Sequence, residues 1–511
     1  MRILSLSICA ALAIVPLKHA AAQAADENRK PGPTKEDLRA ELARLREALA
    51  SARRQGDAAN ERVYLINYPL ARLKARKADL LINTNVFWGP VEQVASRELR
   101  RGLQALSRLA KGETVDLTKP GILELAYECD VDGTAQPFYV LLPENYDPDR
   151  PTPLVVFLHG YVPEINIVDP WVPSETETGA ARSLGFIFMV PYGRRNTDFV
   201  AVGEVDVLDA IEATKRIFNV ASDRIYMMGV SMGGYGTWNI GLRYPHEFAA
   251  LGPVSGQTDM AAWLRRPFDD MPWWKAWHYR WDNPIELADN AVAIPSHLMW
   301  GQDDRLIPVQ HGRNMVARLR RLGADVTYVE VPNEDHYIYW GPRVYDATMK
   351  WFVGKKRDLW PRHVRYRTWS LRYDTAYWVT IEQFKQWGRD ALIDVRVEGD
   401  QRINVQAKNV AAYTLRLSDR LLDPKRKVLV VTNDETSFEG LPPADGRLTV
   451  CLDAAYRDHK DEGLWKRKGL CGPIEDAYNY PFLIVRGTGD ARAAADRFAD
   501  EWDKYADGKP R

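Results

Sequence analysis

The spacing of apolar residues predicts helices in the first part of the chain. A leucine stripe from Leu38 to Leu49 follows the capping signature Thr34–Asp37, and two more helical patterns occupy about 60–83 and 90–111. We therefore predict a helical N-terminal region over residues 25–118. Because the leucine stripe is short, packing on a neighbouring domain explains it better than a coiled-coil dimer.

From about residue 121 the pattern changes to short apolar runs, which then alternate with helical stretches. Two runs come first, at 121–128 and 137–142, and buried-looking strands follow at 154–158, 186–190, 224–229, 249–254, 296–300 and 326–331. This alternation predicts an α/β fold with a doubly wound, mostly parallel sheet, since parallel strands need crossover helices. We assign residues 119–358 to this domain and expect catalytic groups at the carboxyl ends of its strands.

Period-2 alternation dominates after Trp360. It predicts a small antiparallel β domain, of the sandwich type, over residues 359–440. In the tail, residues 441–511, an apolar run at 481–486 predicts a strand and 491–505 predicts a helix. A single strand-helix unit cannot close a sheet of its own, so we expect the tail to dock on the rest of the protein.

The N-terminus has the pattern of a signal peptide. Arg2 precedes an apolar run from Ile3 to Leu17, and Ala22–Ala24 forms an AxA cleavage site. We predict a signal peptide over residues 1–24 and a secreted protein, periplasmic or extracellular. Cleavage there leaves Cys129, Cys451 and Cys471, an odd number in a compartment that permits disulfides, and Cys451 with Cys471 is the pair that we consider.

Composition narrows the class of partner. The 511 residues include 69 Lys plus Arg and 69 Asp plus Glu, so the formal net charge is zero and no long-range field selects nucleic acid or an anionic membrane. After the signal peptide no segment is long and apolar enough to span a membrane. We therefore expect a small-molecule or neutral-polymer substrate. The 17 Trp and 23 Tyr hint at an aromatic-lined pocket.

The strongest chemical signal is a serine between glycines. An apolar strand, 224–230, runs into Gly229-Val230-Ser231-Met232-Gly233-Gly234 and then into a helix. A nucleophile elbow needs glycine on both sides of the serine because the turn is tight and any Cβ would strike the strand or the helix. This context favours Ser231 as an exposed nucleophile over an ordinary glycine-rich turn.

A serine hydroxyl needs a base, and the base needs a carboxylate that orients it. The sequence 300–308 follows one predicted strand, and its spacing G-x-x-D-x-x-x-P favours Asp304 over Asp303 as the acid. His336 follows the next strand, on a loop at the same edge of the sheet, and is our candidate base.

The oxyanion of an acyl-transfer intermediate needs two N–H donors. We assign one to Met232, directly after the nucleophile, and the other to Tyr161, in the loop after the strand 154–158. His159 in the same loop fits a structural role better than a catalytic one.

The region from about 121 to 356 resembles the α/β-hydrolases grouped with prolyl-oligopeptidase-type catalytic domains and with bacterial predicted peptidases and dienelactone-hydrolase-like esterases. The matching residues are Asp132-Gly133, Gln136-Pro137-Phe138, His159-Gly160, Gly203–Val207, Ser231 with its glycines, Tyr244-Pro245, Phe248–Ala250, Asp304 and His336. The resemblance implies an α/β-hydrolase fold, a Ser-His-Asp triad and hydrolysis. The chain departs from prolyl oligopeptidases in having a helical N-terminal region where those enzymes have a β-propeller.

Two groups of residues are candidates for substrate binding. An aromatic-rich insertion between the strands 249–254 and 296–300 includes Trp263, Trp273, Trp274 and Trp277. These rings could bind an aromatic acyl group or a sugar, or they could form the insertion's own small core. Arg194 and Arg195 could pair a substrate carboxylate. A surface or structural role is the alternative for both arginines.

Together these features predict a secreted serine hydrolase that needs neither metal nor cofactor and works through an acyl-enzyme. Its substrate is an ester, a peptide or a carbohydrate-linked compound, with carboxylic esters preferred. The alternative is a prolyl-oligopeptidase-type serine peptidase. A more remote alternative is a carbohydrate-binding pseudo-enzyme whose β domain carries the function.

Overall fold

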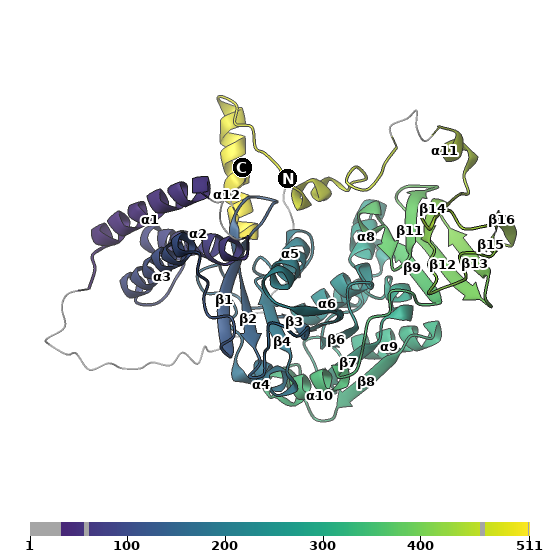
Figure 1. Ribbon diagram of the computed structural model, residues 1–511, viewed down its shortest axis with the longest axis horizontal. Helices are drawn as coiled ribbons and strands as arrows, with labels where there is room; N and C mark the ends of the chain where they lie inside the picture. Colours follow the sequence, from purple (N-terminus) through teal and green to yellow (C-terminus); the bar gives the residue numbers. More distant parts are fainter. Residues whose placement is uncertain (1–31, 56–60, 460–464, 509, 511) are drawn as a thin grey trace.

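The computed structural model describes residues 32–55, 61–459, 465–508 and 510. A helical layer lies at one end of the molecule, a large α/β sheet in the middle and a β domain at the other end (Figure 1). The predicted signal peptide, residues 1–24, lies outside the described residues. Within them, no helix combines the length and the apolar character that a membrane span requires.

Three helices build the N-terminal layer, as the spacing predicts. They are α1 (Lys35–Gln55), α2 (Glu61–Asn83) and α3 (Val91–Lys111). Thr34 caps α1: its hydroxyl accepts the Asp37 N–H at 3.2 Å while the Asp37 carboxylate accepts the Thr34 N–H at 2.9 Å. The stripe from Leu38 to Leu49 is buried in a core that it shares with α2 and α3. Its partners therefore lie within the chain.

The central sheet has eight strands in the order β1-β2-β4-β3-β5-β6-β7-β8. Their bounds are β1 (Gly121–Glu128), β2 (Ala135–Leu142), β3 (Thr152–Leu158), β4 (Ile187–Pro191), β5 (Val220–Val230), β6 (Ala250–Val254), β7 (Ser296–Gly301) and β8 (Val326–Val331). The pairs β1/β2 and β2/β4 are antiparallel and the remaining pairs are parallel. The predicted α/β class with a doubly wound, mostly parallel sheet is confirmed.

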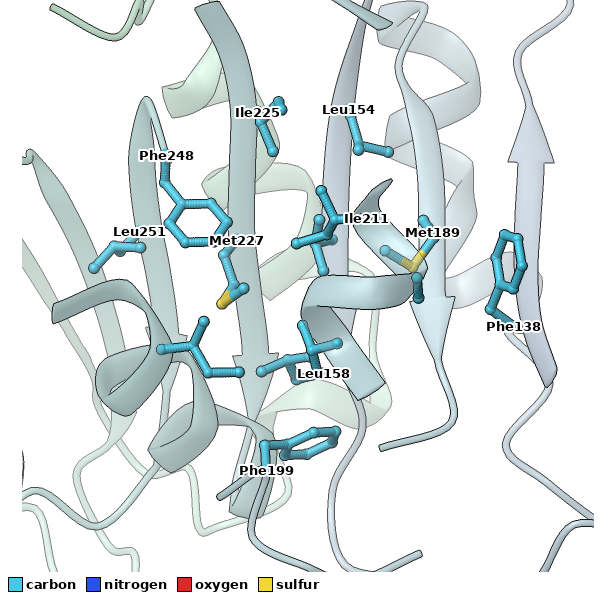
Figure 2. Close-up of a cluster of buried hydrophobic side chains, with 14 of the residues drawn as sticks. Phe138, Leu154, Leu158, Met189, Phe199, Ile211, Ile225, Met227, Phe248 and Leu251 are labelled. Atoms are coloured by element: carbon cyan, nitrogen blue, oxygen red, sulfur yellow. The ribbon is translucent and has the colours of Figure 1, made fainter. Parts of the chain in front are cut away.

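Helices cover both faces of this sheet, because alternate side chains of a strand point to opposite faces. On β3, Leu154, Val156 and Leu158 belong to one core, and Val155 and Phe157 belong to the other. Figure 2 shows side chains of the first core packed against the strands. The first core includes side chains of α5 (Val202–Ile217), α6 (Met232–Arg243) and α9 (Gln310–Leu322), and the second includes side chains of α4 (Glu175–Leu184) and α10 (Arg343–Phe352).

The β domain is formed by two sheets that share one core. The first has the order β16-β15-β13-β12-β9 and the second β10-β11-β14-β17. Their bounds are β9 (His363–Thr368), β10 (Thr375–Ala376), β11 (Val379–Phe384), β12 (Ala391–Glu398), β13 (Arg402–Lys408), β14 (Val410–Arg416), β15 (Val428–Thr432), β16 (Glu435–Gly440) and β17 (Arg447–Cys451).

Two details of the predicted β domain are corrected. The pair β13/β15 is parallel, whereas the other strand pairs described in these two sheets are antiparallel. The domain also extends past residue 440, because β17 pairs with β14 through Ala412 to Arg416 and buries Leu448 and Val450. This strand has only five residues and follows a loop rich in Pro, Asp and Gly, which favoured its assignment to the tail.

The tail differs from its prediction. No strand forms at 481–486, where Leu483 and Val485 are exposed. Phe482 nevertheless packs on Trp502 of α12 (Asp490–Ala506), with ring centroids 5.0 Å apart, and α12 packs against the first core of the sheet. The disulfide that we considered between Cys451 and Cys471 is not formed. The Cys471 thiol lies instead 3.3 Å from the Ser370 hydroxyl.

Short elements complete the described chain. They are α7 (Met260–Trp263), α8 (Trp273–Trp281), α11 (Ala454–His459) and the 3₁₀ turns η2 (Phe268–Asp270), η3 (Ala288–Ala293), η4 (Ile338–Trp340), η5 (Leu371–Tyr373) and η6 (Ile474–Asn479).

Buried charges join the β domain to the sheet domain. Glu204 of α5 is fully buried and accepts hydrogen bonds from Arg243 of α6 at 3.0 Å, Arg372 of η5 at 3.2 Å and the Tyr373 hydroxyl at 3.1 Å. A charge this deep is tolerated only with several partners, so the carboxylate fixes where η5 sits on α5 and α6.

A second buried cluster, between the helical layer and the sheet, makes a pH-dependent prediction. The Lys74 and Lys77 ammonium groups of α2 lie 2.5 and 2.7 Å from the Glu124 carboxylate of β1. Burial by itself would raise the pKa of Glu124, but the two ammonium groups outweigh it and lower this pKa to about 2. The stability that comes from this depressed pKa is complete above the unfolded value near 4.3 and is lost as the pH falls toward about 2.

We therefore expect Glu124→Gln to lower the free energy of unfolding at pH 7 by about 3 kcal/mol, since it leaves buried ammonium groups short of a counter-charge. The variant should also lose part of the decline in stability between pH 4.5 and 2. Urea unfolding of both proteins at several pH values measures this. Glu113→Gln, on the exposed loop after α3, is the control. Parallel pH profiles for the wild type and Glu124→Gln would contradict the assignment.

Candidate active site

Ser231 lies at the turn between β5 and α6, where its backbone has φ 56° and ψ −118°. A non-glycine residue at positive φ stores strain and persists only where its surroundings hold it. Here the Ser231 N–H donates to the Val254 carbonyl of the neighbouring strand β6 at 2.9 Å. The serine is thereby held at the carboxyl edge of the sheet, at the N-terminus of a helix.

The glycines around Ser231 allow backbones to approach more closely than any side chain would permit. A Cβ on Gly233 would lie 2.0 Å from the Leu158 carbonyl oxygen, and one on Gly229 would lie 2.3 Å from the Gly233 carbonyl oxygen. Both distances are impossible for real atoms, so α6 can start against the ends of β3 and β5 only with glycine at these positions. The motif that identified Ser231 in the sequence therefore reflects this close backbone packing.

Three side chains form a chain of hydrogen bonds at this edge. His336 Nε2 lies 2.9 Å from Ser231 Oγ, and His336 Nδ1 lies 2.8 Å from Asp304 Oδ2. All three residues are buried, with exposed fractions of 8% for Ser231, 3% for His336 and 5% for Asp304. The expectation that Ser231 is exposed is corrected, because His336 and the loop at Gly160 lie against it. The geometry allows the imidazole to accept the serine proton while the carboxylate holds the ring and offsets its charge.

The loops that carry the acid and the base are bound to each other. A Cβ on Gly301 would lie 2.1 Å from the Asp335 carbonyl oxygen, so glycine at the end of β7 allows the histidine loop to lie against it. The Asp303 N–H donates to the Glu334 carbonyl at 2.9 Å. Asp304 Oδ1 accepts the Ile307 N–H at 2.8 Å, which fixes the carboxylate. Asp303 is exposed, and Asp304 is the acid beside the imidazole.

The two predicted oxyanion donors flank the serine. Met232 is the first residue of α6, where a backbone N–H has no partner within the helix. Gly160, directly before Tyr161, would place a Cβ 3.7 Å from the Ser231 Cβ, so this loop lies against the nucleophile. His159 is fully buried, with Nε2 3.1 Å from the Tyr192 carbonyl, and fits the structural role expected of it.

Sequence reasoning missed Tyr339 of η4. Its ring lies edge-on to the His336 ring, with centroids 5.7 Å apart. Burial, then the charges of Tyr337 and Asp304, raise the pKa of the Tyr339 phenol, so it stays neutral. The run of aromatic residues directly after the histidine, His336 to Trp340, is the signal that could have found it.

The assignment of Arg194 to a substrate carboxylate is corrected. Its guanidinium is fully buried and pairs with Asp132 at 2.9 Å and Asp206 at 3.4 Å. With both carboxylates inside the protein, it is not available to a substrate. Arg195 bonds Asp507, just after α12, at 2.5 Å. The C-terminal helix thus holds the loop after β4.

Asp507 also reaches the loop after β3. Its carboxylate accepts the Ile167 N–H at 3.2 Å and the Tyr192 hydroxyl proton. The Tyr192 carbonyl is in turn the partner of His159. Two loops at the active-site edge are therefore tied to one carboxylate of the tail, which the sequence did not suggest because the residues are more than 300 positions apart.

The four predicted tryptophans divide between the surface and a small core of the insertion. Trp273 and Trp274 on α8 are exposed, at 78% and 59%. Trp277 packs on the buried Trp281 with ring centroids 5.2 Å apart, and Trp263 is half-buried on α7. The inner face of α8 is thus the insertion's own small core, and its outer face presents two rings to solvent.

The described residues contain no group of three or more His, Cys, Asp or Glu side chains arranged to hold a metal ion.

Comparison with known proteins shows which family this region is similar to. Residues 201–356 match the sequence profile of the prolyl oligopeptidase family. Dipeptidyl-peptidase 5 of Aspergillus fumigatus is 24% identical over 223 residues, covering 39% of this chain and 31% of that protein. The bifunctional acetylxylan esterase/xylanase XynS20E of Neocallimastix patriciarum is 30% identical over 134 residues, covering 25% of this chain and 19% of that protein.

Among solved structures, an acylaminoacyl peptidase of Pyrococcus horikoshii aligns with a TM-score of 0.37 and 21% identity over 47% of this chain and 42% of that one. The chain spans less than a third of the length of the two curated relatives above. The matched region is an α/β-hydrolase of the prolyl oligopeptidase type, and members of this family are serine hydrolases, either peptidases or esterases.

The hydrogen-bonded set predicts a graded response to substitution. Ser231→Ala and His336→Ala should each lower kcat by about 10⁴-fold or more, and to a similar degree, because residues that act as a unit do not contribute additively. Asp304→Asn should cost about 10⁴-fold, since it removes the charge that orients the imidazole. The exposed Asp303→Asn should change kcat less than threefold. Steady-state kinetics with circular dichroism spectra to check folding would test this. A large loss of kcat in Asp303→Asn together with a nearly unchanged kcat in Asp304→Asn would contradict the assignment of Asp304 as the acid.

Proposed function

We propose that this protein is an exported serine hydrolase that cleaves carboxylic esters through an acyl-enzyme on Ser231. The observation that carries the proposal is the unbroken chain of hydrogen bonds from Ser231 through His336 to Asp304. Export rests on the sequence pattern of residues 1–24, a charged start, an apolar core and an AxA site.

The proposed reaction has two halves. In the first, Ser231 Oγ attacks the ester carbonyl carbon while His336 Nε2 takes the serine proton, and the oxyanion is held by the N–H groups of Met232 and Tyr161. The intermediate then collapses, the carbon–oxygen bond to the alcohol breaks, and His336 returns the proton to the leaving alkoxide. In the second half, His336 deprotonates a water that attacks the acyl group, and the carboxylic acid leaves with Ser231 restored.

Two arguments support esters over peptides. An alkoxide leaves more easily than an amine, so an ester makes smaller demands on His336 as an acid. In addition, the chain has three helices, α1 to α3, where prolyl oligopeptidases have a propeller that screens and holds peptides. The similarity to a protein named as an acetylxylan esterase agrees with ester cleavage.

Peptide hydrolysis is the second candidate. The match to the prolyl oligopeptidase family and to a protein named dipeptidyl-peptidase 5 favours it, and the same triad would serve for both bonds. A carbohydrate-binding pseudo-enzyme has no comparable support, since a chain without catalysis would have no need to hold Ser231 in a strained turn.

Hydrolysis rates on matched ester and peptide substrates distinguish the esterase from the peptidase. We expect the mature protein to hydrolyse short-chain or aromatic-acid esters with a kcat/KM at least about tenfold above that for matched Xaa-Pro anilides, a gap of about 1.4 kcal/mol in transition-state free energy. An unactivated methyl ester must be among the substrates, because activated esters react with many serine hydrolases. Ser231→Ala is the control for background hydrolysis. Efficient peptide cleavage with no turnover of the methyl ester would make peptidase the function.

A further inference from the structure

The residues that follow His336 surround its imidazole with aromatic rings. Tyr337 lies edge-on to the His336 ring with centroids 5.5 Å apart, and Tyr339 does so at 5.7 Å. Ile338 is buried in the second core and anchors the 3₁₀ turn η4. The rings are therefore held in a fixed relation to the proton-transferring nitrogen.

One end of this run is open to solvent. Trp340 stacks on Tyr337, with ring centroids 4.3 Å apart and an interplanar angle of 26°, yet 65% of Trp340 is exposed. A large aromatic side chain is usually buried, and an exposed one near a catalytic group indicates a binding surface. No hydrogen bond of the Trp340 indole or the Tyr337 hydroxyl is among those of the described residues, so packing alone defines the pair as a flat apolar shelf.

The position of the shelf selects one part of the substrate. His336 gives its proton to the departing alcohol, so the alcohol must lie beside the imidazole when the bond breaks. The shelf reaches the imidazole through Tyr337. A group that rests on the shelf is therefore a group of the leaving alcohol.

The surroundings of the shelf select the kind of ring. The loops beside it carry exposed polar side chains, Gln302, Asp303 and Asp335, and the Asp303–Glu334 backbone bond places these loops together. A sugar has apolar C–H faces that stack on an indole and an equatorial rim of hydroxyls that such side chains can bind. The Asp335 carboxylate already accepts the Tyr337 N–H at 2.8 Å, so it is fixed at the edge of the shelf, where a sugar hydroxyl can donate to its free oxygen.

We propose that Trp340 and Tyr337 form a subsite for the pyranose ring of a sugar alcohol, so that the enzyme removes acyl groups from carbohydrate hydroxyls. This inference deepens the proposed ester hydrolysis and rests on it. Trp340 acts through stacking on the leaving group, and it takes no part in proton transfer.

Three acetyl esters that differ only in their alcohol test the subsite: ethyl acetate, benzyl acetate and a monoacetylated methyl xylopyranoside. In Trp340→Ala we expect kcat/KM for the pyranoside ester to fall about tenfold, mainly through KM, while that for ethyl acetate changes less than twofold. Trp340→Phe should restore most of the loss because it keeps a stacking face. Trp465→Ala, on the far β domain, is the matched control and should change none of the three.

The outcomes separate the inference from the proposed function. A loss on the pyranoside ester that exceeds any loss on benzyl acetate supports the subsite, and a loss on benzyl acetate that is equal or larger overturns the carbohydrate assignment. An equal loss on all three esters, or none, overturns the subsite. Binding of methyl xylopyranoside, which has no ester bond, gives a second readout by saturation-transfer NMR. Weaker binding to Trp340→Ala supports the subsite even if no ester is hydrolysed, and unchanged binding overturns it.

Discussion

The close passage of the β5–α6 turn over the end of β3 is the constraint on which the active site depends. Gly229 and Gly233 let backbone atoms meet where a Cβ would stand about 2 Å from a carbonyl oxygen. Only this approach holds Ser231 at positive φ with its hydroxyl at the sheet edge. The parallel order of β5 to β8 then brings the loops that carry Asp304 and His336 to the same edge.

Buried charges, rather than additional apolar cores alone, determine how the outlying parts of the chain sit on this sheet. Glu204 fixes the β domain through Arg372, and Lys74 binds the helical layer to β1. Asp507 ties the C-terminal helix to two loops of the active-site edge. Each of these charged groups is costly to bury without its partner. The pairs therefore favour the observed placement of each segment on the sheet over placements that would separate the partners.

Short sequence patterns correctly predicted the features that depend on neighbouring residues. The Gly-Ser-Gly spacing and the helical and strand periods act over a few residues. The order of Ser231, Asp304 and His336 is the order that the α/β-hydrolase fold uses, and the structure brings the three side chains together. Arg194 was ambiguous in the sequence because one of its partners, Asp132, lies 62 positions away along the chain.

The tail was harder for the same reason. The apolar run 481–486 predicted a strand, but no neighbouring strand is there to pair with it, and only Phe482 finds an apolar partner, on α12. Conversely, β17 alternates over only five residues, and its pairing with β14 makes it part of the β domain. Periodicity shows which face of a segment is apolar, and the fold decides what covers that face.

Covalent labelling of the folded protein tests the central claim most directly, because only an activated serine reacts quickly with a fluorophosphonate. The full chain is treated with the probe, its hydrolytic activity is followed, and the modified peptide is located by mass spectrometry. The account predicts one adduct, on Ser231, that forms as activity is lost and is absent from Ser231→Ala. Folded protein that stays unlabelled, or an adduct on another residue with Ser231 unmodified, would contradict it.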